Sequence, residues 1–166
     1  MCVVVLRATL AFGLLSTLSL ATDLCAVAQN GATFRSRVVT VRARWLIRGH
    51  DVGLTPVDRA LDYWGPCVLY PLLPGTPEFM RAGVDVPEPT DPSYAAFFKQ
   101  YHEHRDGKAV KEWVVDVTGD VQVVSSFRLN SATGYGNGFG YRGVFPVGIR
   151  VTAIRVVDGV DGIKHH

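Results

Sequence analysis

The sequence predicts an α+β domain, with an antiparallel sheet of about four or five strands and two or three short helices packed on one face. It follows an N-terminal hydrophobic segment, residues 1–28. Strand-like and helix-like stretches do not alternate regularly, which argues against a doubly wound parallel sheet. The length of 166 residues suits one core, and a composition of 48% hydrophobic and 19% charged residues is typical of a globular protein.

Residues 1–28 have the features of a secretory signal peptide. They are largely apolar up to Leu20, and Ala26-Val27-Ala28 places small residues at the two positions that signal peptidase reads. Cleavage there leaves a single α+β domain, residues 29–166, in a secreted or extracytoplasmic location. An uncleaved membrane anchor is the alternative, because Arg7 is the only cation of the segment and a long enough apolar run spans a bilayer.

Cleavage after Ala28 would also remove two of the three cysteines, Cys2 and Cys25. Cys67 would then be the single cysteine of the exported domain, with no partner for an intramolecular disulfide. Its apolar neighbours predict a buried thiol, since free cysteine is among the most buried residue types.

An organellar presequence is a further alternative for residues 1–28, although Asp23 is unusual in such a segment.

Residues 37–48 predict a half-buried strand, because apolar side chains stand at every second position from Val39 onward. Arg42, Arg44 and Arg48 share the opposite face, as a row that can bind phosphate, sulfate or carboxylate groups. The alternatives are an edge strand whose charges prevent aggregation, or a row neutralised by acids elsewhere in the fold. The acids that could neutralise it are Asp85, Glu88, Asp91, Asp116 and Asp120.

Two short helices are expected after this strand. Thr55 and Pro56 supply an N-cap and a first-turn proline for a helix that ends at Gly65-Pro66. Thr76-Pro77-Glu78 begins a second helix, which Gly83 closes.

The third and clearest helix follows an extended surface connection, residues 84–92, which is rich in proline and acids. Asp91-Pro92 begins the helix, and four aromatic residues then recur at the spacing of one apolar stripe. They are Tyr94, Phe97, Phe98 and Tyr101. The stripe is expected to pack on the sheet.

The remaining strands are rich in valine. Residues 112–118 and 121–129 read as two strands, and Gly119-Asp120 between them is a two-residue hairpin signal. Residues 147–157 predict a further strand.

A glycine-rich segment lies between the last two of these strands. Gly138-Phe139-Gly140-Tyr141-Arg142-Gly143 formally satisfies G-x-G-x-x-G, but Pro146 argues against the helix that a dinucleotide site requires. With Thr133-Gly134, the segment resembles part of the RNA-recognition motif family, whose aromatic residues stack on bases. It departs from that family at Tyr135-Gly136-Asn137, where basic residues are usual, and only 21 residues (166 − 145) follow Phe145. No nucleic-acid binding is expected.

The same segment predicts a long hairpin loop, flexible because glycine allows positive φ. Tyr135, Phe139 and Tyr141 are the residues expected to contact a ligand or a protein partner.

A histidine cluster is the candidate metal site. His102 and His104 are possible zinc ligands, and Glu103 is a possible general base. On a helix the two histidines are about 200° apart and cannot bind one ion. They would converge only if the helix ended near Tyr101, with His50 as a distant third ligand. The competing interpretation is a solvated last helical turn, where histidine suits the helix dipole.

No complete catalytic set is present in the sequence. The nucleophile-elbow motif G-x-S-x-G is absent. Cys67 with His50 is the remaining combination of a nucleophile and a base.

We therefore expect an exported or membrane-associated binding domain that contacts a protein partner or an anionic ligand. It could serve as an accessory subunit of a larger assembly. The arginine-bearing strand and the aromatic loop would make the contact, and no cofactor is implied. The net charge of +2 is too small to indicate nucleic acid or an acidic membrane, so membrane attachment is expected only through uncleaved residues 1–28. The alternative is a small extracytoplasmic hydrolase using a His/Glu metal site or a Cys/His pair.

Overall fold

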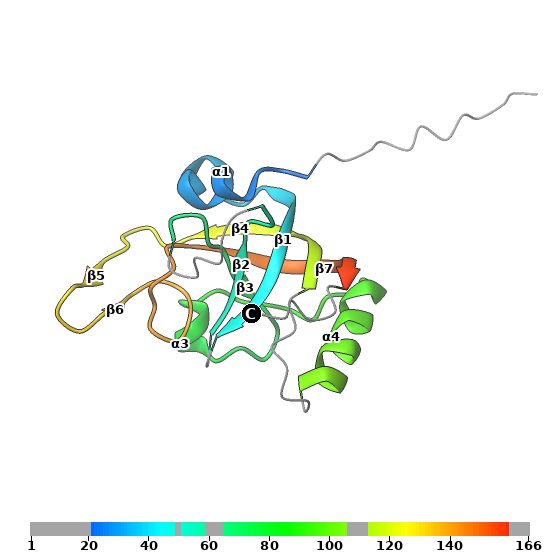
Figure 1. The fold of residues 1–166 in the computed structure, drawn as a ribbon. Coiled ribbons are helices and arrows are strands. Elements are labelled where there is room, and N and C mark those ends of the chain that lie inside the picture. Colours follow the sequence, from blue (N-terminus) through cyan, green and yellow to red (C-terminus); the bar gives the residue numbers. More distant parts are fainter. Residues whose placement is uncertain (1–20, 49–50, 59–64, 106–112, 160–166) are drawn as a thin grey trace, which may run out of the picture.

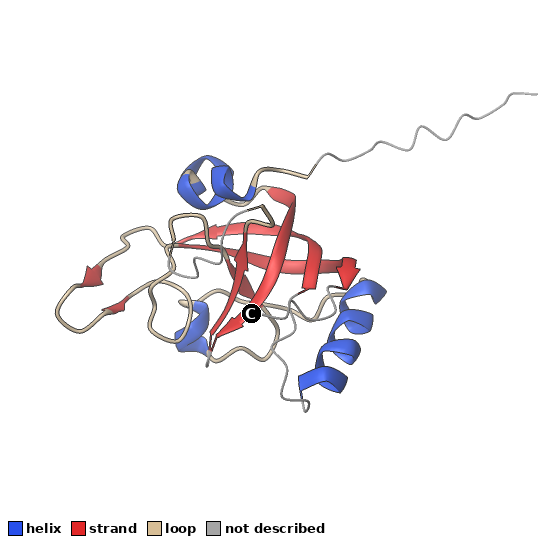
Figure 2. Ribbon diagram, viewed as in Figure 1, coloured by secondary structure: helices blue, strands red, loops and turns tan. Residues whose placement is uncertain are grey.

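The structure is a computed structural model that describes residues 21–48, 51–58, 65–105 and 113–159. It is a mixed α+β fold in which a five-stranded, mostly antiparallel sheet curls into a nearly closed barrel (Figure 1). The barrel strands are β1 (Val38–Arg48), β2 (Asp51–Thr55), β3 (Tyr70–Leu72), β4 (Trp113–Val123) and β7 (Val147–Gly159). Figure 2 shows the helices at the periphery of the strands. They are α1 (Leu24–Gln29), α2 (Gly31–Phe34), α3 (Glu78–Arg81) and α4 (Pro92–Arg105).

The strand order is β2-β1-β4-β7-β3, and it closes on itself. The pairs β1–β2, β1–β4 and β4–β7 are antiparallel, whereas β3 and β7 are parallel. Leu54 of β2 and Leu69, next to β3, complete the circle through two backbone hydrogen bonds of 2.9 and 3.1 Å. The expected strand number is confirmed. The sheet is not wholly antiparallel because a closed ring with an odd number of strands must contain at least one parallel pair.

Strand β1 confirms the alternation seen in the sequence. Val41, Ala43 and Trp45 are fully buried inside the barrel. The strand lies between β2 and β4, so the interpretation of its arginines as protection of an exposed sheet edge is wrong.

The prediction of a hairpin at Gly119-Asp120 is also wrong. Strand β4 runs without a break through these residues, and a register shift between Thr118 and Gly119 marks a bulge against β7. Gly119 is needed there because a Cβ at this position would lie 2.2 Å from the carbonyl oxygen of Arg150. Glycine in a strand often marks such a close backbone approach as well as a turn, and the sequence alone does not distinguish them.

The bulge also changes which residues of β7 face the barrel interior. Val151 pairs with Gly119 and Ala153 with Thr118, so Thr152 is the extra residue. Val151 and Ile154, three positions apart, are both buried in the same core. A regular strand would place them on opposite faces.

The helices agree in part with expectation. Helix α3 and the extended connection after it are confirmed, and α3 ends where Ala82 and Gly83 adopt φ of 49° and 77°. Helix α4 begins at Pro92, and the Asp91 Oδ1 accepts a hydrogen bond of 2.8 Å from the Ser93 amide. Thr55 is the exception, because it belongs to strand β2 and does not cap a helix. Most of the helix expected after it lies outside the described residues.

Helix α4 packs its aromatic stripe against the barrel core, as expected. Phe97 is the centre of this contact, with ring centroids 4.9 Å from Trp45 and 5.9 Å from Trp113. Helix α1 adds Leu24 and Val27 to the same core from a different side, so the helices do not share one face of the sheet (Figure 1).

A second apolar cluster lies on the other face of β3. Leu69 belongs to the barrel core, whereas Tyr70 and Leu72 pack with residues of the glycine-rich loop. Phe139 and Phe145 of that loop are buried here, and the Phe145 ring stacks on Tyr70 at 5.6 Å. This cluster fixes the loop to the outside of the barrel.

Candidate functional site

Cys67 forms a disulfide with Cys25, with their Cα atoms 4.5 Å apart. The bond joins helix α1 to the segment that leads into β3, so Cys67 is not the lone thiol expected from the sequence. In this state Cys67 has no thiolate, and the suggested pairing with His50 lacks its nucleophile. His50 itself lies outside the described residues.

The histidine cluster does not meet the condition for a shared metal ion. Helix α4 continues to Arg105 and does not end near Tyr101, so His102 and His104 remain about 200° apart on the helix. The exposed His102 ring packs at 5.4 Å from Tyr101 and 6.1 Å from Phe98. The side chains of Glu103 and His104 lie outside the described part of the chain. Within the described ranges, no group of three or more His, Cys, Asp or Glu side chains is placed to hold a metal.

The arginine row is engaged with the protein. The Arg42 guanidinium donates from Nε and Nη2 to the two carboxylate oxygens of Asp116, at 2.8 and 3.1 Å. Arg155 donates to the same carboxylate at 2.7 Å, so one acid joins arginines of β1 and β7 across β4. Arg44 donates to the carbonyl oxygen of Val57 at 2.7 Å. The side chain of Arg48 lies outside the described set.

For Arg42, these contacts support the interpretation in which acids elsewhere in the fold neutralise the row. The bidentate geometry that would hold an external anion is used within the sheet by Asp116. Arg42, one of the residues that the sequence had singled out on β1, therefore contributes to cohesion between strands.

The Asp116 carboxyl predicts a pH dependence. Its pKa is lowered, first by the hydrogen bond from Arg42 and then by Arg155, against an opposing effect of burial. A carboxyl whose pKa is lower in the folded state stabilises the fold above its unfolded pKa of about 3.9. That contribution is lost as the pH falls through the folded value. In acid titrations followed by circular dichroism, Asp116→Asn should be less stable than the native chain at pH 7 and should lose less stability below about pH 4. Parallel curves for the two proteins would contradict the prediction.

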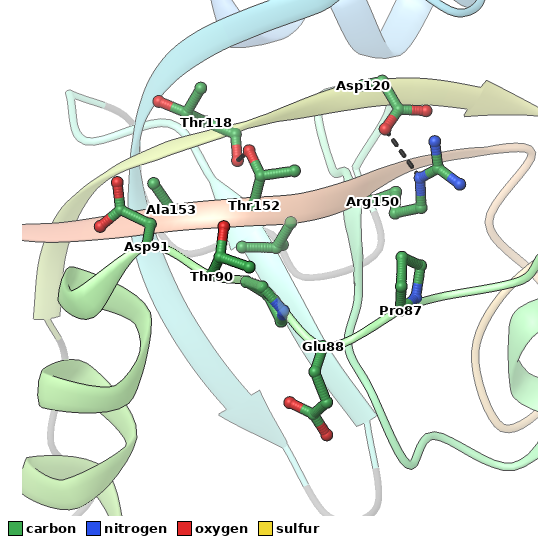
Figure 3. A pocket seen from close by; sticks show the side chains of 11 residues that line it. Pro87, Glu88, Thr90, Asp91, Thr118, Asp120, Arg150, Thr152 and Ala153 are labelled. Carbon is green, nitrogen blue, oxygen red and sulfur yellow. Dashed lines mark hydrogen bonds and ion pairs between the residues drawn. The ribbon is translucent and has the colours of Figure 1, made fainter.

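A pocket of about 370 Å³, lined by several polar side chains, lies between the connection that precedes α4 and the outer face of β4 and β7 (Figure 3). Arg150 and Asp120, two of the charged residues that line it, form an ion pair. Arg150 donates to Asp120 at 2.8 Å and to the carbonyl oxygen of Asp85 at 3.3 Å. The Thr152 hydroxyl donates to the carbonyl oxygen of Thr118 at 3.2 Å. The bond from Arg150 to Asp85 joins the connection to the sheet, and the other two contacts join β7 to β4.

The glycine-rich loop, residues 124–146, is extensively hydrogen-bonded, contrary to the expectation of a flexible loop. It contains the short strands β5 (Leu129–Asn130) and β6 (Tyr135–Gly136). Backbone bonds link Gly138 to Gly143 at 2.7 Å, and Phe139 and Phe145 bond each other at 2.7 and 3.2 Å. A Cβ on Gly138 would lie 2.3 Å from the carbonyl oxygen of Phe145. Here glycine allows two backbone segments to approach closely.

Of the three loop residues predicted to contact a ligand, one is buried and two are exposed. Phe139 is 1% exposed and belongs to the second apolar cluster, so its assignment as a ligand-contacting residue is wrong. Tyr135 and Tyr141 are 51% and 45% exposed, as a contact role requires. The guanidinium of Arg142 lies over the Tyr135 ring, 5.8 Å from its centroid.

Two further residues complete this surface. Phe79 of helix α3 is 62% exposed, and its ring lies 6.4 Å from Tyr141. Leu129 is 54% exposed and lines, together with Arg142, the pocket described below. We name this surface the loop face and define it as Phe79, Leu129, Tyr135, Tyr141 and Arg142. Phe79 was not predicted from the sequence; it lies in a helix of only four residues, none of which is buried.

A second pocket of about 370 Å³ adjoins the loop face. Gly65, Pro66 and Val68 line one side, and Leu129, Arg142 and Val144 contribute from the loop. The lining is mainly apolar, with Arg142 as its charged group. A ligand pocket typically has this combination of apolar walls with a few polar groups.

Within the described ranges, no helix has both the length and the hydropathy needed to cross a membrane. Comparison of the chain with protein-family models, curated proteins and solved structures finds no match.

Proposed function

We propose that this protein is an exported binding domain whose loop face and adjoining pocket recognise a protein partner. The partner segment carries apolar side chains together with an acidic group that pairs with Arg142. Binding rather than catalysis is favoured because the candidate nucleophile Cys67 is held in a disulfide and the helical histidines do not converge.

The clustering of exposed apolar side chains is the observation that carries this proposal. Six large hydrophobic residues are exposed among the described residues, and four of them belong to the loop face. Single exposed hydrophobic residues are ordinary, whereas a contiguous group marks an interaction surface. Val38 and Val157, the other two, lie on barrel strands and make good control positions.

The composition of the loop face also suits protein recognition. Aromatic residues and arginine are enriched at the centres of protein interfaces and among the residues that contribute most to affinity. The backbone hydrogen bonds of the loop hold these side chains in place before binding. Such preorganisation reduces the entropy lost on association.

The barrel supports the same location for a binding site. Counting the barrel strands along the chain, the closed order is first, second, third, fifth, fourth, with α4 between the third and the fourth. This connectivity resembles the OB-fold, in which the loop between the fourth and fifth strands takes part in ligand binding. Residues 124–146 form that loop here. Because one fold hosts many functions, the resemblance supports the position of the site and not the identity of the ligand.

A displayed random-peptide library, selected on the oxidised protein, tests this function. We expect enriched peptides that combine aromatic or leucine residues with an acid. Their affinity for a Tyr135→Ala/Tyr141→Ala variant should fall at least about tenfold, the effect of losing about 1.4 kcal/mol. Val157→Ser, which changes an exposed residue outside the loop face, should bind as the native chain does. Failure to enrich any peptide, or equal affinity for all three proteins, would contradict the proposal.

A further inference from the structure

We infer that signal peptidase cuts this chain between Ala21 and Thr22, and that Cys25 and Cys67 are joined in the export compartment. The inference rests on the proposed export. It replaces the expected cut after Ala28 with one that preserves both the disulfide and helix α1.

Helix α1 belongs to the barrel core. Leu24 and Val27 are 4% and 0% exposed, and both pack in the same cluster as Trp45. A cut after Ala28 would remove these side chains and leave the core surface beneath them uncovered. It would also remove Cys25 and leave Cys67 without its partner.

The folded chain is anchored from Thr22 onward. The Thr22 amide donates to the carbonyl oxygen of Thr40 at 2.7 Å, which fixes the segment beside β1. The Asp23 side chain then accepts a hydrogen bond of 3.0 Å from the Cys25 amide and caps α1. Ala21, in contrast, is exposed. A new N-terminus at Thr22 therefore keeps every described residue that packs in the core.

The sequence just before Thr22 suits the peptidase. Ser19-Leu20-Ala21 has small residues at the first and third positions before the cut, and it directly follows the apolar stretch. Ala26-Val27-Ala28 has the same pattern but stands farther from that stretch. The packing of α1 distinguishes two sites that the pattern alone does not.

Two chemical steps follow. Water hydrolyses the Ala21–Thr22 peptide bond, which leaves a carboxylate on Ala21 and an amino group on Thr22. The thiols of Cys25 and Cys67 then lose two protons and two electrons to a protein disulfide oxidant of the compartment, by thiol–disulfide exchange. The oxidant is reduced to a dithiol, and the Sγ–Sγ bond forms.

Intact mass spectrometry of the full-length chain expressed in a secreting host tests both steps. We expect the mass of residues 22–166 less two hydrogens, and alkylation of two cysteines only after reduction. Ala21→Arg should retain residues 1–21, because a large charged side chain does not suit the position before the cut. Ala26→Arg is the matched control, and its cut should remain after Ala21.

The possible results separate this inference from the proposed export. A mature chain that starts at Gln29, or an Ala26→Arg variant that is no longer cut, would overturn the inference and leave export standing. A chain in the membrane fraction that still carries residues 1–21 would overturn the cut alone. A chain in the cytosol that still carries them, with all its cysteines reduced, would overturn export as well.

Discussion

Reduction of the Cys25–Cys67 disulfide should lower the free energy of unfolding by about 4 kcal/mol. The two cysteines are 42 residues apart in the sequence, so the bond closes a long loop and restricts the unfolded chain. The bond also joins α1 to the entry of β3, which is the strand that completes the barrel. Denaturant unfolding with and without a thiol reductant measures the difference.

A Cys25→Ser/Cys67→Ser variant is the control for this measurement. It should match the reduced native chain in stability, and added reductant should not change it. An equal unfolding midpoint for the oxidised and reduced native chains would contradict the expected role of the disulfide. Dependence of the double variant on reductant would contradict the assignment of the effect to this disulfide.

Phe97→Ala should destabilise the fold by about 3 to 5 kcal/mol, the usual cost of truncating a large aromatic residue in a core. Phe97 is 2% exposed and contacts both Trp45 and Trp113. Its loss would open a cavity where α4 meets β1 and β4. Urea unfolding, with the same slope expected for native and variant chains, gives the difference in free energy.

Phe79→Ala is a matched control because it makes the same chemical change at a residue that is 62% exposed. Its effect on stability should be about 0.5 kcal/mol or less, as for most surface substitutions. On the proposed function it should weaken peptide binding. If Phe79→Ala destabilised the chain as much as Phe97→Ala, the assignment of these two residues to the surface and the core would be wrong.

Local patterns in the sequence were reliable where the signal comes from residues close together within one element. Alternation from Val39 identified the buried face of β1, and Asp91-Pro92 identified the start of α4. Both signals reflect short-range physics, namely the period of two in a strand and the capping of a helix. The aromatic stripe of α4 followed from the same kind of reasoning and packs as expected.

The candidate site was less predictable because exposure depends on contacts between distant segments. Tyr135 and Phe139 looked equivalent in the glycine-rich loop, yet Tyr135 is exposed and Phe139 is buried beside Tyr70 and Leu72. Arg42 looked available for an anion until the strand register placed Asp116 opposite it. No pattern within either segment carries that information.

The sequence by itself determined the α+β class, the strands β1 and β7 and the main helix, because hydrophobic periodicity and turn residues act over a few positions. The tertiary structure alone decided the closure of the barrel, the partner of Cys67 and the role of Gly119. Each of these depends on residues far apart in the chain meeting at one place. The physical reason is that a disulfide, a salt bridge and a close backbone approach are set by distance in space, which local residue patterns do not encode.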